Sequence, residues 1–407
     1  MRVLVVGSGG REHALAWKLA QSPRLEALHA APGNPGIARL GECHPVRAED
    51  AEGLLGLCRE LATDLVVVGP EAPLVAGLAD ALRYGGVAVF GPSRDAARIE
   101  GSKSFAKDVL EAAGVPTAER LAVARPPCVV KSDGLAAGKG VFVCRTQEEL
   151  DRGLRSAAAL GDEVVIEELL EGEEVSLFVL TDGHEALPLA PAQDFKRIGD
   201  GDTGPNTGGM GAYSPVPGLG EPELEELVDM VHRPVLAELA RRGTPFAGLL
   251  YAGLMLTDDG PRVLEFNCRF GDPETQSILP RLEGDLLDAL TGAALGALET
   301  QLTAGDSAAV TVVLAGGDYP KSSDSGTPIT GTDDAETAGA LVFHAGTARR
   351  GKTLVTNGGR ILNVTATGDD LVAARAAAYE ATEQISFAGM QFRRDIGLAA
   401  AEGHVRG

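Results

Sequence analysis

Cysteine is scarce in this chain of 407 residues. The five cysteines form no C-x-x-C pair, their odd number leaves one unpaired, and they are few for a chain of this length. We therefore expect reduced thiols in a cytoplasm and no zinc site. They are Cys43, Cys58, Cys128, Cys144 and Cys268.

Positive charge is also in short supply. Lys and Arg number 36 against 58 Asp and Glu, which gives a net charge of −22. A nucleic-acid surface needs clustered Lys and Arg to displace counterions from phosphates, so the composition argues against a nucleic-acid partner. Any anionic ligand must be bound in a local positive pocket.

Long hydrophobic runs are absent. No apolar stretch approaches the roughly 18 residues of a membrane span. The N-terminus, MRVLVVGSGG, enters a predicted strand directly and has no signal-peptide pattern. We therefore expect a cytoplasmic protein with no membrane partner, and its length allows about two to four domains.

The first 100 residues alternate apolar strand-like runs with helical stretches, among them one helical stretch over 74–86. Continuous apolar strands separated by helices predict a doubly wound parallel sheet, which binds ligands at the carboxyl ends of its strands. Glycine or proline ends each run, at Gly7, Pro32, Gly33, Gly69, Pro70, Gly91 and Pro92.

After residue 100 the pattern changes. Residues 117–180 predict a small α+β lid, with strands near 129, 141, 164 and 175 and a helix over 147–159. A mixed region on either side, 101–116 and 181–308, would form the central domain. Residues 309–407 predict a C-terminal mixed α+β domain, in which the polar stretch 321–331 is expected to be an exposed loop.

The segment VVGSGGREH resembles a dinucleotide fingerprint but departs from it. Glu12 stands where the third glycine is required, and the second strand ends without the acid that binds a ribose hydroxyl. Backbone N–H groups at a helix start, with Arg11 beside them, fit a sugar phosphate better. A tight turn without a ligand is the alternative.

Residues 129–143, VVKSDGLAAGKGVFV, place a glycine-rich, cationic loop between two strands. The loop is not a Walker A motif, because three residues separate Gly134 from Gly138 and Gly140 follows Lys139. It can close over nucleotide phosphates as a flap, with Lys131 directed at them. A plain hairpin loop remains the other interpretation.

Two acidic segments follow. In VVIEELLEGEEVS (164–176), a strand ends in a hinge whose backbone could bind the edge of an adenine base, while Glu174 could accept hydrogen bonds from ribose hydroxyls. The alternative is an acidic turn exposed to solvent. In RVLEFNCRFGDPETQ (262–276), strand alternation predicts Val263, Glu265 and Asn267 on one face.

Glu265 and Asn267 offer oxygen ligands of the kind that Mg²⁺ prefers, unless they are a buried hydrogen-bonded pair. Arg269 follows on the same face and could hold a carboxylate or an acyl phosphate. The glycine-rich stretch DTGPNTGGMGAYSP (202–215) has no core to make, so it is either disordered or an ordered substrate loop.

Taken in order, these segments resemble the ATP-grasp ligases over essentially the whole chain, and most closely those that join glycine to phosphoribosylamine in purine biosynthesis. The segments that carry the resemblance are VLVVGSGGREHALAWKLAQSP, APGNPG, VVGPEAPLVAGL, GSKSFAKD, KSDGLAAGKGV, DTGPNTGGMGAYSP, LLYAGLM, EFNCRFGDPETQ, VFHAGT and VTNGGRILNVTA. The resemblance implies four domains: 1–100, 101–116 with 181–308, 117–180, and 309–407.

The resemblance also implies roles for single residues. It places ATP phosphates on Lys103 and Lys131, with Lys131 and Arg269 as catalytic residues. It places adenine at the hinge of Glu167 and Leu169, ribose at Glu174, and Mg²⁺ (or Mn²⁺) on Glu265 and Asn267. The implied flap residues are Gly138, Lys139 and Gly140, and the implied substrate-binding residues are Gly9, Gly10, Arg11, Asn34, Glu71, Asp194 and Gly209.

Two departures stand out. The strand YAGLML, before Glu265, offers no second acidic metal ligand, and the connection from Pro116 to Val129 is short and predicts no helix.

The expected reaction joins glycine to 5-phosphoribosylamine through glycyl phosphate and releases ADP and phosphate. The chain is expected to be a monomer and complete as a single enzyme. Three alternatives remain: an ATP-grasp ligase for another acid or amine, a nicotinamide-dependent oxidoreductase, and a nonenzymatic nucleotide sensor.

Overall fold

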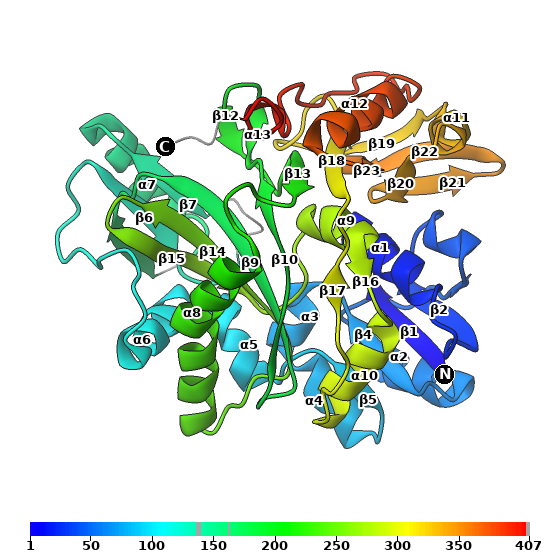
Figure 1. Cartoon of the computed structure of the whole chain (residues 1–407), viewed down its shortest axis with the longest axis horizontal. Coiled ribbons are helices and arrows are strands. Elements are labelled where there is room, and N and C mark those ends of the chain that lie inside the picture. Colours follow the sequence, from blue (N-terminus) through cyan, green and yellow to red (C-terminus); the bar gives the residue numbers. More distant parts are fainter. Residues whose placement is uncertain (136–139, 162, 404–407) are drawn as a thin grey trace.

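A computed structural model describes residues 1–135, 140–161 and 163–403. The N-terminal part contains a five-stranded parallel sheet in the order β3-β2-β1-β4-β5, at the lower right of Figure 1. Its strands are β1 (Arg2–Gly7), β2 (Ala27–Pro32), β3 (Glu42–Cys43), β4 (Leu65–Val68) and β5 (Ala88–Phe90). The predicted doubly wound sheet is confirmed, and its central strands are buried because helices cover both faces.

Helices connect these strands. They are α1 (Gly10–Leu19), the 3₁₀ helix η1 (Ile37–Arg39), α2 (Ala51–Leu61), α3 (Glu71–Ala76), α4 (Leu78–Tyr84) and α5 (Arg94–Gly101). The prediction of a single helical stretch over 74–86 is wrong: Gly77 adopts φ +93° and separates α3 from α4. Glycine tolerates this left-handed conformation, which ends a helix.

An eight-stranded sheet extends from the central part into the C-terminal part, in the order β15-β14-β9-β10-β13-β18-β23-β20. These strands are β9 (Glu173–Thr181), β10 (Ala186–Asp194), β13 (Gly211–Ser214), β14 (Gly248–Thr257), β15 (Gly260–Asn267), β18 (Ala308–Ala315), β20 (Leu341–His344) and β23 (Arg360–Gly368). The strand predicted near residue 175 is therefore not a lid strand: β9 pairs with β10 and β14.

The lid projects at the left of Figure 1 and has a three-stranded sheet in the order β7-β6-β8. Its elements are β6 (Cys128–Ser132), β7 (Val141–Cys144), α7 (Gln147–Ala158) and β8 (Val164–Glu168). Thr146 and Glu149 form a capping box at the start of α7. No helix lies among the described residues between α6 (Lys103–Ala113) and β6, as predicted.

The remaining elements complete the central and C-terminal parts. They are β11 (Arg197–Gly199), β12 (Thr203–Asn206), α8 (Glu221–Arg241), α9 (Glu274–Ile278), η2 (Leu279–Arg281), β16 (Leu282–Glu283), α10 (Leu286–Leu295), β17 (Thr303–Ala304), β19 (Asp324–Pro328), α11 (Thr332–Thr337), β21 (Thr347–Arg350), β22 (Thr353–Gly358), α12 (Leu371–Thr382) and α13 (Leu398–Ala401). The loop expected over 321–331 is in part a strand, because β19 pairs with β22. No helix of the described residues is long and apolar enough to cross a membrane.

Buried side chains connect the N-terminal and central parts. One hydrophobic cluster includes Leu4 and Val68 of the parallel sheet together with Val175 and Leu177 of β9. A separate small cluster, which includes Cys128, Val130 and Leu150, forms the core of the lid. The N-terminal and central parts therefore share a core, whereas the lid has its own.

Candidate functional site

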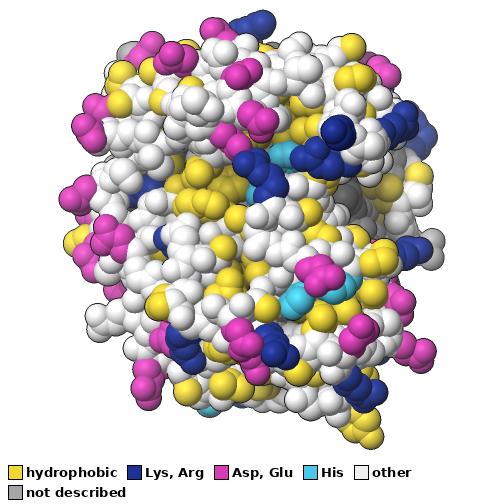
Figure 2. All heavy atoms as spheres, turned by 90° about the vertical axis from the view of Figure 1, so that its right-hand side faces the viewer, with side chains coloured by type: hydrophobic (Ala, Val, Ile, Leu, Met, Phe, Trp, Pro, Cys, Tyr) yellow, Lys and Arg dark blue, Asp and Glu magenta, His cyan; other side chains and the backbone are white. Residues whose placement is uncertain are grey.

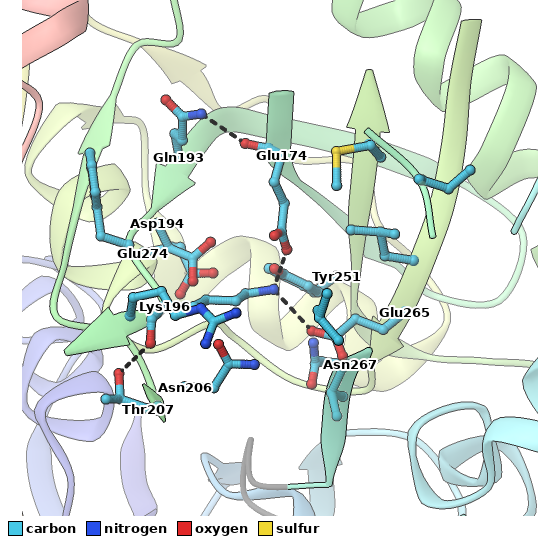
Figure 3. A pocket seen from close by; sticks show the side chains of 18 of the residues that line it. Glu174, Gln193, Asp194, Lys196, Asn206, Thr207, Tyr251, Glu265, Asn267 and Glu274 are labelled. Atoms are coloured by element: carbon cyan, nitrogen blue, oxygen red, sulfur yellow. Dashed lines mark hydrogen bonds and ion pairs between the residues drawn. The ribbon is translucent and has the colours of Figure 1, made fainter. Parts of the chain in front are cut away.

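A cavity of about 1090 Å³ lies where the four parts of the chain meet. Each part contributes to its lining: Arg11 from the N-terminal part, Lys131 from the lid, Glu265 from the central sheet and Arg360 from the C-terminal part. Figure 3 shows its polar region, with side chains from several strands converging around Lys196. The cavity is therefore built from segments far apart in the sequence.

Lys131 stands in the wall of the cavity on β6. Its Nζ lies 2.6 Å from Glu167 Oε2 and donates to the Leu264 carbonyl at 2.9 Å. Lys107 Nζ lies 3.0 Å from the other oxygen of Glu167, and all three charged side chains are buried. Because Glu167 is held between two lysines, its carboxylate is not free to meet a ligand.

An apolar section of the cavity adjoins the hinge between β8 and β9. The hinge residues Glu167 to Glu174 line the cavity. Its lining also includes aliphatic and thioether side chains, namely Val129, Val143, Met255 and Leu264. An apolar section of this kind suits a purine base, and the adenine position at Glu167 and Leu169 stays a prediction.

Lys103, at the start of α6, is fixed by the loop that follows β6. Its backbone N–H donates to Asp133 Oδ1 at 2.5 Å, and its Nζ donates to the Gly134 carbonyl at 3.0 Å. Burial lowers the pKa of Lys103, and Glu265 opposes that shift. Gly140 also lines the cavity, whereas the predicted flap residues Gly138 and Lys139 lie outside the described residues.

The predicted oxygen-bearing face of β15 is correct for Glu265 and Asn267, which both line the cavity. It is wrong for Val263, which is buried in the hydrophobic core with Phe266 and Cys268. The register of β14 with β15 shifts between Gly253 and Leu254, opposite Glu265 and Val263. Such a bulge interrupts the regular alternation of side chains, so Val263 and Glu265 point to different faces.

The oxygen donors on β15 fit a divalent cation. Lys196 lowers the pKa of Glu265 against the opposing effect of burial, and Lys131 and Lys103 lower it further, so this carboxylate is ionised at neutral pH. Asn267 Oδ1 accepts from Arg269 Nη2 at 3.0 Å, which leaves its second lone pair for a ligand. A carboxylate and an amide oxygen are the donors that Mg²⁺ favours.

Lys196, which was not predicted from the sequence, connects the predicted ribose and metal positions. Its Nζ donates to Glu174 and lies 3.4 Å from Glu265 Oε1 (Figure 3). Burial opposes the charge on Lys196, but Glu174 and Glu265 raise its pKa well above the ordinary value. The sequence offered one signal, since Gln193, Asp194 and Lys196 follow an apolar run at the end of β10.

Asp194 and Glu274 are two further acids beside Lys196 (Figure 3). Burial raises the pKa of Asp194 well above its usual value, with Lys196 opposing, and burial also raises the pKa of Glu274. Ser176 Oγ donates to Glu274 at 3.3 Å. The site thus pairs an ionised carboxylate, Glu265, with two acids that hold their protons to higher pH.

Arg269 does not present a free guanidinium. Its Nε donates to Glu71 at 3.0 Å and its Nη2 donates to Glu100 at 3.2 Å. Burial would raise the pKa of Glu71, but Arg269 and Arg11 lower it to about 2. A substrate carboxylate at Arg269 would have to share it with these acids, so its catalytic role stays a prediction.

Three of the seven predicted substrate-binding residues line the cavity. Arg11, Glu71 and Asp194 line the cavity, whereas Gly9, Gly10, Asn34 and Gly209 are outside its lining. Asn34 Oδ1 accepts from the backbone N–H groups of Gly36 and Ile37, which shapes its own loop. A Cβ at Gly10 would lie 2.2 Å from Asn363 Nδ2, so this glycine is required by close packing.

Arg360, on β23, was also missed. Its Nη1 donates to the carbonyls of Gly208 and Asp272, and its Nη2 lies 3.2 Å from Asp272 Oδ2. It thereby fixes the glycine-rich loop over 202–215, which is ordered and contains β12 and β13. A single arginine after two glycines carries no sequence signal of such a contact.

Comparisons with known proteins cover the whole chain. Three family models match consecutive segments: the phosphoribosylglycinamide synthetase N domain over residues 1–100, its ATP-grasp (A) domain over 101–275 and its C domain over 309–399. A protein of Streptomyces coelicolor named phosphoribosylamine–glycine ligase is 53% identical, covering 98% of this chain and 100% of that protein. One of the same name from Mycobacterium tuberculosis is 50% identical and covers 100% of both chains.

Solved structures agree. The crystal structure of phosphoribosylamine–glycine ligase from Thermotoga maritima superposes with a TM-score of 0.83 and 34% identity, covering 97% of this chain and 100% of that one. Biotin carboxylase from Campylobacter jejuni shares the fold alone, with a TM-score of 0.70 and 14% identity over 98% of this chain and 95% of that one. On these matches, the chain belongs to the phosphoribosylglycinamide synthetase family of ATP-grasp enzymes.

Proposed function

We propose that the chain is a phosphoribosylamine–glycine ligase, which joins glycine to 5-phosphoribosylamine with ATP and yields glycinamide ribonucleotide, ADP and phosphate in purine biosynthesis. The observation that carries this proposal is the composite cavity, where Lys103, Lys131 and the Glu265–Asn267 pair adjoin the loops of an N-terminal sheet. Relatives that carry this name match the chain from end to end.

ATP is proposed to bind with its base in the apolar section at the hinge and its ribose at Glu174. Its phosphates extend towards Lys103 and Lys131, whose positions are fixed by Gly134 and Glu167. Fixed ammonium groups stabilise developing phosphate charge without reorganising during the reaction. Glu265 and Asn267 would hold Mg²⁺ (or Mn²⁺), which would neutralise phosphate charge when bound.

In the first step, a glycine carboxylate oxygen attacks the γ-phosphorus, the bond to the β-phosphate oxygen breaks, and ADP leaves glycyl phosphate behind. In the second step, the 1-amine of phosphoribosylamine attacks the acyl carbon and the carbon–oxygen bond to phosphate breaks. The departing phosphate takes the proton that the amine loses. No protein nucleophile is needed, so positioning and charge neutralisation supply the catalysis.

The substrates are proposed to bind on opposite sides of Arg269. Glycine would lie near Arg269 and Asp194, and the phosphosugar near Arg11 and Glu71, which face the cavity from the N-terminal part. Gly9, Gly10, Asn34 and Gly209 would contribute through the shape of their loops. A monomer in the cytoplasm is the proposed working form.

The decisive measurement is ADP release from purified protein with Mg·ATP, each substrate being omitted in turn. ADP formation that requires both glycine and freshly generated phosphoribosylamine, with a product containing both, supports the proposal. Turnover that is indifferent to phosphoribosylamine would indicate a ligase for another acid or amine. Nucleotide binding without turnover for any amine would indicate a sensor.

A further inference from the structure

A second group of ligand-bearing side chains lies outside the cavity, at the edge of the parallel sheet. Within the part of the chain that the structure describes, His29, Glu42 and His44 are the one group of His, Cys, Asp or Glu side chains whose ligand atoms all lie within 4.8 Å of one another. Histidine side chains adjoin an acidic one on the face shown in Figure 2. None of the three lines the cavity described above.

The strand register brings these residues together. His29 on β2 is the direct partner of Glu42 on the parallel edge strand β3. His44 follows Glu42 by two residues, and its backbone N–H donates to the Ala30 carbonyl at 2.8 Å, which continues the pairing beyond β3. Residues two apart on a strand share a face, so all three side chains project from the same side of the sheet.

Their geometry is close to that of a metal site. His29 Nδ1 lies 3.1 Å from His44 Nε2 and 3.9 Å from Glu42 Oε2. Two nitrogens on a tetrahedral zinc ion, each about 2.0–2.1 Å from it, stand about 3.3 Å apart. The two nitrogens share a hydrogen bond, so a change of tautomer at the donor ring and a rotation of both rings would place both imidazoles on one ion. The Glu42 side chain is 70% exposed, so it can reorient to join them.

The surroundings of His29 keep its imidazole neutral rather than charged. Burial and His44 lower the pKa of His29, with Glu42 opposing, so this imidazole is neutral and keeps a lone pair at neutral pH. A metal requires that neutral form. Arg2, the nearby cation that disfavours charge on His29, is itself paired with Glu26 at 3.1 Å.

We propose that His29, Glu42 and His44 bind one divalent transition-metal ion such as Zn²⁺, with water completing the shell. Two imidazoles select zinc, nickel or copper over magnesium, so the site is chemically distinct from the oxygen donors at Glu265 and Asn267. The scarcity of cysteine, which argued against a zinc site, excludes only thiolate ligation. The bound ion would link the two-residue strand β3 to β2 and would thereby stabilise the N-terminal sheet.

The test is a zinc titration of the untagged full-length chain after chelator treatment, followed by calorimetry in excess Mg²⁺, which occupies oxygen-only sites. We expect one equivalent of Zn²⁺ to bind and to raise the Tm. Co²⁺ in its place should give visible absorption of a four-coordinate ion. No zinc binding by the wild-type chain would overturn the proposal.

Variants locate the site. His44→Gln should weaken zinc binding at least about tenfold, by analogy with the loss of other metal-site contacts, and abolish the Tm shift, while ligase turnover with Mg²⁺ stays unchanged. His184→Gln, at an exposed position in the turn between β9 and β10, is the matched control and should bind zinc like the wild type.

Glu42→Gln changes an exposed side chain, so the fold should be unaffected, and it should also weaken zinc binding. Zinc affinity that is unchanged in both site variants would contradict the assignment.

Discussion

At the scale of single residues, the site depends on which carboxyl groups are ionised. Glu265 is ionised because Lys196, Lys131 and Lys103 surround it, whereas burial keeps protons on Asp194 and Glu274 to higher pH. Acids that are close together in the site thus differ in charge because their surroundings differ.

Glu265→Gln should lower kcat by roughly 100-fold or more, because the amide removes a full negative charge from the proposed metal position while keeping the shape of the side chain. The fold and the Tm should change little. Steady-state ADP release at saturating Mg²⁺ measures the effect. Glu226→Gln, on the exposed face of α8, is the control and should behave like the wild type. Turnover near the wild-type rate in Glu265→Gln would show that the metal lies elsewhere.

Lys196→Met should move the acid limb of the pH–rate profile to higher pH. Lys196 is the largest influence that lowers the pKa of Glu265, so its loss raises that pKa and lets the carboxylate protonate at higher pH. Lys196→Arg retains the charge and should restore most of the profile. An acid limb that does not move in Lys196→Met would mean that another group controls it.

Asp194→Asn tests the raised pKa through stability. An acid whose pKa is higher in the folded than in the unfolded state stabilises the fold below its unfolded pKa, and this contribution is lost as the pH rises through the folded value. The wild type should therefore lose more of its free energy of unfolding than Asp194→Asn between about pH 4 and the folded pKa. Urea titrations across that range measure the difference; parallel curves would refute it.

At the scale of elements, the start of α6 connects the lid to the central part. Asp133 accepts from the Lys103 backbone N–H at 2.5 Å, from Ser104 Oγ and from the Gly134 N–H at 2.9 Å. Burial opposes its charge, but these donors lower the pKa of Asp133 overall. One carboxylate therefore positions both a proposed phosphate-binding lysine and the glycine-rich loop.

Asp133→Ala should destabilise the chain by about 1–3 kcal/mol, because it leaves helix-start donors unsatisfied. It should also raise the KM for ATP more than it lowers kcat, since Lys103 loses its support. Ser102→Ala removes the other cap of the same helix, a hydroxyl that accepts from the Phe105 N–H at 3.2 Å, and serves as the comparison. Equal effects of the two variants on KM would show that Asp133 acts on the helix alone.

The elements also show how far sequence reasoning reaches. The parallel sheet could be predicted because its strands are apolar runs ending in glycine or proline, and Glu265 with Asn267 could be predicted because two oxygen ligands stand two apart on a strand. The face of Val263 could not, because a bulge leaves no mark in the sequence. The sheet to which β9 belongs could not either, because pairing with β14 joins residues distant in sequence. Arg360 reaches the site only through tertiary contacts, whereas Lys196 stands two residues after the predicted Asp194.

At the scale of the whole molecule, the shared core and the separate lid core predict two responses to truncation. Phe246→Ala, in the core that joins the N-terminal and central parts, should cost about 3–5 kcal/mol of global stability. Leu150→Ala, in the small core of the lid, should weaken ATP binding while the main unfolding transition moves less. Calorimetry and nucleotide titration of both variants measure this; equal losses in Tm would show that the lid unfolds with the rest.

The continuous eight-stranded sheet has a consequence for any shortened form of the chain. Removing the residues from 308 onwards would take away β18, and with it the partner of β13 on that side. The N–H and C=O groups of Gly211–Ser214 would then face solvent as an open edge, and Arg360 would no longer hold the loop before it. Open edges recruit strands from other molecules, so such a fragment should self-associate rather than behave as a smaller enzyme.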